Sequence, residues 1–179
     1  MEIINCIIEE LNEEPFIFGH SLDGLTVIRY AETRPDKVRG VVASSSALAK
    51  TPKTPSFIVA LAKILGKITP SLTLSNGIDP NILSRNPETA KRYIEDLLVH
   101  GKISTKLGIS LFNNINAAHT EAQKIKFLVL LLISTDDVIT LPGASRRLFE
   151  ELAVKGKTLK EFEGTYHEIF EDPKWGRVS

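Results

Sequence analysis

The sequence lacks the features that mark several classes of protein. It has one cysteine, Cys6, so neither an intrachain disulfide nor a cysteine-based zinc site can form. Basic and acidic residues each number 22, and the resulting net charge of zero argues against a broad nucleic-acid-binding surface. The longest apolar run, residues 127–133, is too short to span a membrane, and the acidic start is unlike a signal peptide. These absences predict a soluble, cytoplasmic protein that binds no nucleic acid.

The composition is that of one ordered globular unit. Hydrophobic residues make up 42% and charged residues 25% of the 179 residues, which are ordinary values for a folded domain. Chains that remain disordered are poorer in apolar residues, so we expect a packed core.

Apolar runs alternate with helical patterns along most of the chain. Strands are expected where apolar residues are continuous or alternate, namely at residues 15–19, 38–43, 127–133 and 158–162. Helices are expected where apolar residues recur every three to four positions, namely at residues 1–12, 22–33 and 144–153. Alternation of strand and helix is typical of a parallel sheet with right-handed crossovers. The first strand is apolar throughout, so we expect it to be buried on both faces.

The middle of the chain departs from this alternation. We expect no strand between about residues 48 and 122, but helices near 56–66, 87–98 and 102–118, which predicts a helical insertion. The chain therefore divides into core residues 1–46, an inserted cap at 47–122 and core residues 123–179. The helix near 56–66 is apolar almost all round, which favours a helix packed in a small subdomain. The same helix would also suit a lid that accepts an acyl chain or contacts a lipid interface.

The turn between Gly19 and Gly24 carries the strongest sign of chemistry. A strand ends at Gly19 and a helix begins within three residues, so the turn exposes the Ser21 side chain above the sheet. Backbone N–H groups at the new helix terminus can stabilise an oxyanion at the same place. A phosphate-binding loop is a weaker interpretation, because Leu25 stands where that loop needs a lysine. A serine that only caps the helix is the remaining alternative.

A base and an acid for Ser21 occur later in the chain. Of the four histidines, His167 follows the last expected strand, at the sheet end where active sites of open parallel sheets collect. Asp136 and Asp137 follow the strand at 127–133, and one of them could orient His167 while the other lies in a solvated turn. The order serine, aspartate, histidine is that of the α/β-hydrolase triad.

Three segments resemble the monoacylglycerol lipase and lysophospholipase branch of the α/β-hydrolases, also called the serine aminopeptidase S33-like group. They are GHSLDG, STDDVITLP and EGTYHEIFED. The resemblance implies Ser21 as nucleophile and His167, three residues after Gly164, as base. It selects Asp137 over Asp136 as the acid, because the family has a proline five residues beyond it. The implied fold is a partial α/β-hydrolase, with about four parallel strands, flanking helices and an inserted helical lid.

The function that the resemblance implies is hydrolysis of monoacylglycerol or lysophospholipid-like esters, with no metal or organic cofactor. Asp23 departs from the family, which has glycine there, and we expect its side chain to crowd the turn. Family members have several strands before the turn and a closing helix after the base, so the chain resembles a hydrolase truncated at both ends. The loop with the second oxyanion donor is then missing, and the Leu22 N–H is the one donor that can be named.

Truncation has a further consequence for the first strand. An uncovered edge of the first strand predicts pairing with a second copy of the chain or with a complementing polypeptide. The lid could also contact a membrane or lipid interface transiently. The alternative to an esterase is a catalytically weak or inactive hydrolase-like module that binds lipid or needs a partner segment.

Overall fold

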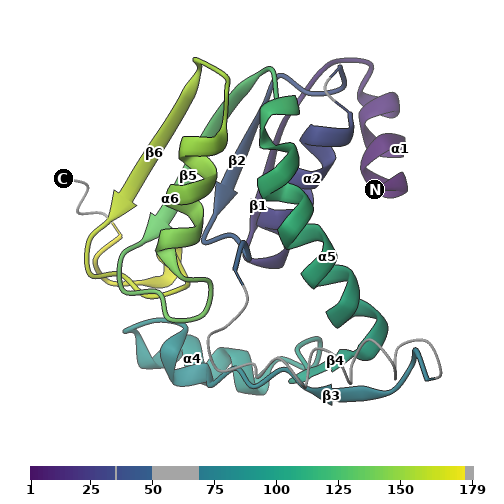
Figure 1. Cartoon of the computed structure of the whole chain (residues 1–179). Helices are drawn as coiled ribbons and strands as arrows, with labels where there is room; N and C mark the ends of the chain where they lie inside the picture. The colour runs from purple at the N-terminus through teal and green to yellow at the C-terminus, as the bar shows by residue number, and fades with distance from the viewer. Residues whose placement is uncertain (35, 50–68, 176–179) are drawn as a thin grey trace.

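The computed structural model describes residues 1–34, 36–49 and 69–175, and its centre is a four-stranded parallel sheet. The strand order is β1-β2-β5-β6, so the four strands lie in the sheet in the order in which they occur along the chain (Figure 1). The prediction of an α/β fold with about four parallel strands is confirmed. The strands of this sheet are β1 (Phe16–His20), β2 (Gly40–Ser44), β5 (Leu128–Ser134) and β6 (Lys157–Phe162). The helices that accompany it are α1 (Glu2–Leu11), α2 (Leu22–Thr33), α5 (Thr105–Glu121) and α6 (Pro142–Glu151).

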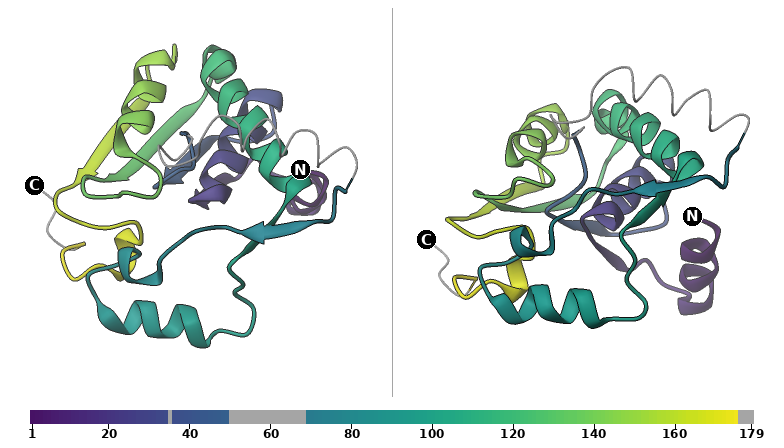
Figure 2. Two further views of the ribbon diagram at one scale, coloured as in Figure 1. Left: turned by 60° about the horizontal axis from the view of Figure 1, so that its bottom comes forward. Right: turned by 90° about the horizontal axis from the view of Figure 1, so that it is seen from below.

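One face of the sheet is covered by helices. Side chains alternate between the two faces of a strand, and the register places Val41 beside Val129 and Ala43 beside Leu131. All four are 1–3% exposed and belong to one core cluster with side chains of α2, α5 and α6. These three helices therefore pack on the same face, as the view from below shows (Figure 2). We call this the covered face.

The other face is apolar but has little cover. The side chains of Phe16, Phe18 and Leu128 are 58%, 54% and 53% exposed. In register with them lie three partly buried side chains, those of Val42, Leu130 and Leu132. We call these six residues the open face. The prediction that the first strand is buried on both faces is wrong, because Phe16 and Phe18 stay more than half exposed. Phe170 of the short helix η3 (Ile169–Glu171), whose ring centroid lies 6.0 Å from that of Phe18, gives only partial cover.

The first helix joins the core through one stripe only. Ile8 is buried with Tyr30 and Val38, and Ile4 packs against this small cluster. Ile3 and Ile7, on another side of the same helix, are 77% and 52% exposed. The apolar spacing therefore predicted the helix correctly, although only part of its apolar surface is buried.

The insertion contains strands that its sequence did not indicate. β3 (Thr73–Ser75) and β4 (Lys102–Ser104) pair antiparallel, so the expectation of no strand between residues 48 and 122 is wrong. Each has three residues, and β3 is fully exposed, so neither shows an apolar alternation. The short helix η1 (Pro80–Ile82) and α4 (Pro87–Glu95) lie between them. The helix expected near 56–66 lies outside the described residues.

The last helix of the insertion reaches the main core. Ile115 and Ala118 of α5 are buried in the cluster that covers the sheet, and Ala122 of η2 (Ala122–Lys124) continues it. The division of the chain at residues 46 and 122 stays a prediction. Among the described residues, no helix is both long and apolar enough to cross a membrane.

Candidate active site

The turn after β1 is shaped by two glycines. A Cβ atom on Gly19 would lie 2.2 Å from the Asp23 carbonyl oxygen, and one on Gly24 would lie 2.3 Å from Ser46 Oγ. Both distances are far below any tolerated contact, so only glycine allows the strand to turn so sharply into α2. The expectation that the Asp23 side chain crowds the turn is wrong, because that residue is exposed. The close approach occurs at Gly24, one position later.

Ser21 occupies the apex of this turn in a strained conformation. Its φ of 55° and ψ of −116° lie outside the regions that L residues favour. Three backbone hydrogen bonds hold the apex: the Ser21 N–H donates to the Ser44 carbonyl, and the Ala47 and Leu25 N–H groups donate to the Ser21 carbonyl. Leu22 begins α2, where the first backbone N–H groups have no partner within the helix. The Leu22 N–H is thus available to an oxyanion near Ser21.

The loop after β5 separates the two neighbouring aspartates. Asp137 is 4% exposed, and its Oδ1 accepts hydrogen bonds from the Ile139 and Thr140 backbone N–H groups at 2.7 and 3.1 Å. Its Oδ2 accepts one from the Thr140 hydroxyl at 2.5 Å. Asp136 has a 48% exposed side chain and forms an ion pair with Arg85 at 2.8 Å. The two residues therefore have the two environments that the sequence analysis expected of such a pair.

The loop after β6 holds His167 in place. The Ser45 hydroxyl donates to the His167 carbonyl at 2.9 Å, and the Tyr166 N–H donates to the buried Asp172 carboxylate at 3.1 Å. Gly164 supports the bend that precedes them, with a φ of 66°. These contacts fix the backbone at His167 beside Ser45, the residue that follows β2.

The structure brings Ser21, Asp137 and His167 together. His167 Nε2 lies 2.9 Å from Ser21 Oγ, and His167 Nδ1 lies 2.8 Å from Asp137 Oδ2. A carboxylate can only accept, so the Nδ1–H donates to Asp137 and leaves Nε2 to accept from the Ser21 hydroxyl. With this arrangement His167 can take the proton of Ser21 as the serine attacks a carbonyl carbon, while Asp137 orients the ring.

Asp137 is held in its charged form. Burial raises the pKa of its carboxyl group, but the hydrogen bond and charge of His167 and the donors from Thr140 and Ile139 outweigh burial, so the pKa lies below its usual value. A charged Asp137 favours the imidazolium that forms when His167 takes a proton.

The sequence analysis did not identify two residues beside the triad. The ring of His20 lies 4.8 Å from that of His167 between centroids, and His20 Nε2 lies 3.2 Å from Glu168 Oε2. Burial raises the pKa of Glu168, but its contacts with His20 outweigh burial and lower the pKa overall. Their positions in the sequence could have indicated this pair, because His20 precedes Ser21 and Glu168 follows His167. A fold that brings Ser21 and His167 together therefore also brings His20 close to Glu168.

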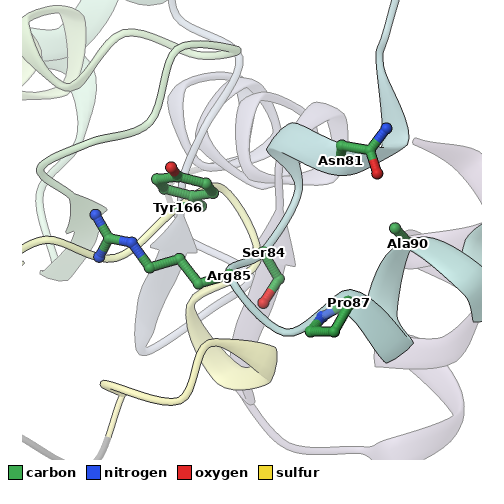
Figure 3. Close-up of a pocket in the computed structure, with 6 residues that line it drawn as sticks. All are labelled: Asn81, Ser84, Arg85, Pro87, Ala90 and Tyr166. Atoms are coloured by element: carbon green, nitrogen blue, oxygen red, sulfur yellow. The ribbon is translucent and has the colours of Figure 1, made fainter.

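A pocket of about 420 Å³ lies where the insertion meets the loop of His167 (Figure 3). Arg85 extends over the Tyr166 ring, with its guanidinium carbon 4.5 Å from the ring centroid. The residues that line the pocket are Asn81, Ser84, Arg85, Pro87, Ala90 and Tyr166. Amide, hydroxyl and guanidinium groups in its wall make it better suited to a polar group than to an acyl chain.

Comparison with known proteins identifies the family of the chain. The model of the family described as "Serine aminopeptidase, S33" matches residues 2–174. The chain belongs to this family. The Paleococcus ferrophilus monoacylglycerol lipase is 71% identical in sequence, and its crystal structure matches this one with a TM-score of 0.94. The match covers 98% of this chain and 68% of that lipase chain. A monoglyceride lipase from Saccharomyces cerevisiae, 19% identical with a TM-score of 0.82 over 94% of this chain and 60% of its own, shares the fold.

Two of the relatives found by sequence are also lipases. The Mycolicibacterium smegmatis monoacylglycerol lipase is 29% identical and the human monoglyceride lipase 31% identical, each over 88% of this chain. The chain spans 56% and 52% of the length of these two lipases. The resemblance that the three motifs indicated is thus confirmed, including the partial coverage of the family.

Proposed function

We propose that this chain is a serine ester hydrolase that acts on monoacylglycerols. The observation that carries the proposal is the continuous relay from Asp137 through His167 to Ser21, with contacts of 2.8 and 2.9 Å. Membership of the S33 family and the similarity to monoacylglycerol lipases support the substrate class. Lysophospholipid-like esters, which carry one acyl chain as well, are the second substrate class.

The proposed reaction has two halves. His167 Nε2 takes the Ser21 proton while Oγ attacks the ester carbonyl carbon, and the Leu22 N–H donates to the resulting oxyanion. The protonated His167 then gives its proton to the leaving glycerol oxygen. Water, activated by His167, releases the fatty acid from the acyl-enzyme and regenerates Ser21. Asp137 keeps the ring in the required tautomer throughout.

The intact relay favours a hydrolase over the alternative of a module that only binds lipid. A module of that kind would not require the strained φ of 55° at Ser21, nor a charged aspartate buried behind His167. The acyl chain is proposed to bind beneath the inserted segment, residues 47–122, which would act as a lid at a lipid interface.

The test of this proposal is covalent labelling with a fluorophosphonate. The wild-type chain should be labelled once, and Ser21→Ala should abolish labelling because the attacking oxygen is gone. Ser71→Ala removes an exposed serine elsewhere and is the matched control, which should be labelled like the wild type. Circular dichroism checks that each variant is folded. Labelling that survives in Ser21→Ala would overturn the proposal.

We further propose that the isolated chain pairs with a second copy through β1 and the open face. In the described residues, β1 has β2 as its one neighbour, so one row of its backbone groups is unpaired. β1 contains no lysine, arginine, aspartate or glutamate that would oppose pairing, and both of its phenylalanines are exposed. A complementing polypeptide strand would satisfy the same groups.

A further inference from the structure

Two histidines and a glutamate meet directly beside the candidate active site. They are His20, His167 and Glu168, and one ligand atom from each lies within 4.8 Å of the other two. In tetrahedral zinc sites with bonds of about 2.1 Å, neighbouring ligand atoms lie about 3.4 Å apart. His20 Nε2 and Glu168 Oε2, 3.2 Å apart, already have this spacing. His167 has a ring nitrogen within 4.8 Å of the ligand atoms of both residues, so a shift of its ring toward them would complete three ligands.

Both rings are oriented as metal-binding histidines usually are. His167 Nδ1 is bound to the Asp137 carboxylate at 2.8 Å, and His20 Nδ1 lies 3.2 Å from Ser44 Oγ. A metal-bound histidine almost always uses its second ring nitrogen in this way, because the hydrogen bond fixes the tautomer and the ring direction. In both rings Nε2 is then the nitrogen left for a ligand bond.

The Nε2 atom of His20 has a charged neighbour in Glu168 but no well-formed hydrogen bond. It is buried, and it has no hydrogen-bond partner with acceptable geometry among the described residues, although Glu168 lies at ion-pair distance. A buried polar atom without a partner costs free energy, so a ligand that engages it gains more than it would at a satisfied site. The side chains of His20 and Glu168 are 22% and 31% exposed, so an ion can reach them from solvent.

We propose that His20, Glu168 and His167 form an inhibitory site for a divalent transition-metal ion of the zinc type. Two neutral imidazoles and one carboxylate match the borderline ligand preference of Zn²⁺, with water in the fourth position. The metal takes the Nε2 lone pair of His167, the same lone pair that accepts the Ser21 proton. No covalent or redox step is involved: the ion and the Ser21 hydroxyl compete for one nitrogen atom.

The direct test is a zinc titration of the purified chain against a chromophoric chelator, which needs no catalysis. The wild type should bind one Zn²⁺, and His20→Gln and Glu168→Gln should each bind at least tenfold more weakly. His100→Gln removes an exposed histidine outside the cluster and is the matched control, with unchanged affinity expected. Equal affinity in the wild type and both cluster variants, or equal loss in the control, would overturn the proposal.

Two further measurements separate this site from the proposed function. Ser21→Ala should lose fluorophosphonate labelling yet bind zinc at least as well as the wild type, because it removes the competitor for His167. Loss of zinc binding in Ser21→Ala would contradict the site. In the wild type, zinc should slow labelling at the concentrations at which it binds, and Glu168→Gln should need at least tenfold more. Labelling that zinc does not slow would show that the ion does not engage His167.

Discussion

The two faces of the sheet differ in cover although they are built from the same strands. Leu131 on the covered face is 1% exposed, whereas Leu128, three residues earlier in β5, is 53% exposed. On one side α2, α5 and α6 fill the space above the strands. On the other side, the ring of Phe170 beside Phe18 leaves the strand side chains more than half exposed at Phe16, Phe18 and Leu128. Apolar strand residues therefore show which surfaces require a partner, but not whether the same chain provides one.

A buried and an exposed aspartate lie next to each other in the loop after β5, and this pair gives the largest predicted effect. Asp137→Asn should lower the rate of p-nitrophenyl ester turnover by about 10⁴, because the amide cannot hold His167 in the required tautomer. Asp136→Asn is the matched control: that residue is exposed and bound to Arg85, so the rate should remain within about twofold. Equal losses in the two variants would show that the loop, rather than the buried carboxylate, matters.

Leucine truncation on the two faces tests the contrast itself. Leu131→Ala should lower the free energy of unfolding by about 2–5 kcal/mol, because it leaves a cavity in the packed core. Leu128→Ala should change it by less than about 0.5 kcal/mol, because solvent already reaches that side chain. Urea unfolding followed by circular dichroism measures both values. Similar losses at the two positions would mean that another surface covers the open face in solution.

The elements of the sheet were predictable because each depends on local pattern. The continuous run before Gly19 predicted β1, and the run at 127–133 predicted β5 to within one residue. What failed was the expectation of burial for Phe16 and Phe18, since burial depends on neighbours that a local pattern cannot show. The short strands β3 and β4 were not predicted, because strands of three largely exposed residues show no apolar pattern in the sequence.

The candidate site was predicted from its motifs to a similar extent. Ser21, Asp137 and His167 follow strand ends, and parallel strands place their carboxyl ends along one edge of a sheet. The contacts of His20 and Glu168 were not predicted, because the motifs GHSLDG and EGTYHEIFED contain these residues but indicate side-chain roles only for Ser21 and His167. The contacts of Thr140 and Ser45 also required the folded loops, since these hydroxyls bind groups of Asp137 and His167.

Association of the isolated chain provides the next test of the open face. Phe18→Lys should weaken self-association at least tenfold, because it replaces an exposed aromatic side chain of the edge strand with a charged one. Ile94→Lys is the control: Ile94 is 69% exposed as well, but it lies on α4, away from the sheet. Sedimentation velocity over a range of concentrations measures both variants. A wild-type chain that is monomeric at every concentration would contradict pairing through a second copy.

The smallest predicted effect concerns a carboxyl group that is buried on α2, one of the helices of the covered face. Glu32 on α2 is 3% exposed and contacts Arg29, which also binds Glu121 at 3.1 Å. Burial raises the pKa of Glu32 to about 7, since the opposing effect of Arg29 is smaller and the charge of Glu121 raises the pKa further. Lys124, which pairs with Glu121, lowers it slightly.

The raised pKa of Glu32 predicts the direction in which stability changes with pH. Between about pH 5 and pH 7 the folded chain keeps the Glu32 proton while the unfolded chain has lost it, so stability decreases as the pH rises. The contribution is full below the unfolded pKa and is lost as the pH approaches the folded pKa of about 7. Glu32→Gln should remove a decrease of roughly 1–2 kcal/mol between pH 5 and pH 7, seen as the difference between variant and wild type in urea unfolding. Carboxyl groups with a lowered pKa, such as Glu161, are common to both chains and cancel in that difference. Parallel pH profiles for the two chains would show that Glu32 is charged in its buried position and that the covered face holds a true ion pair.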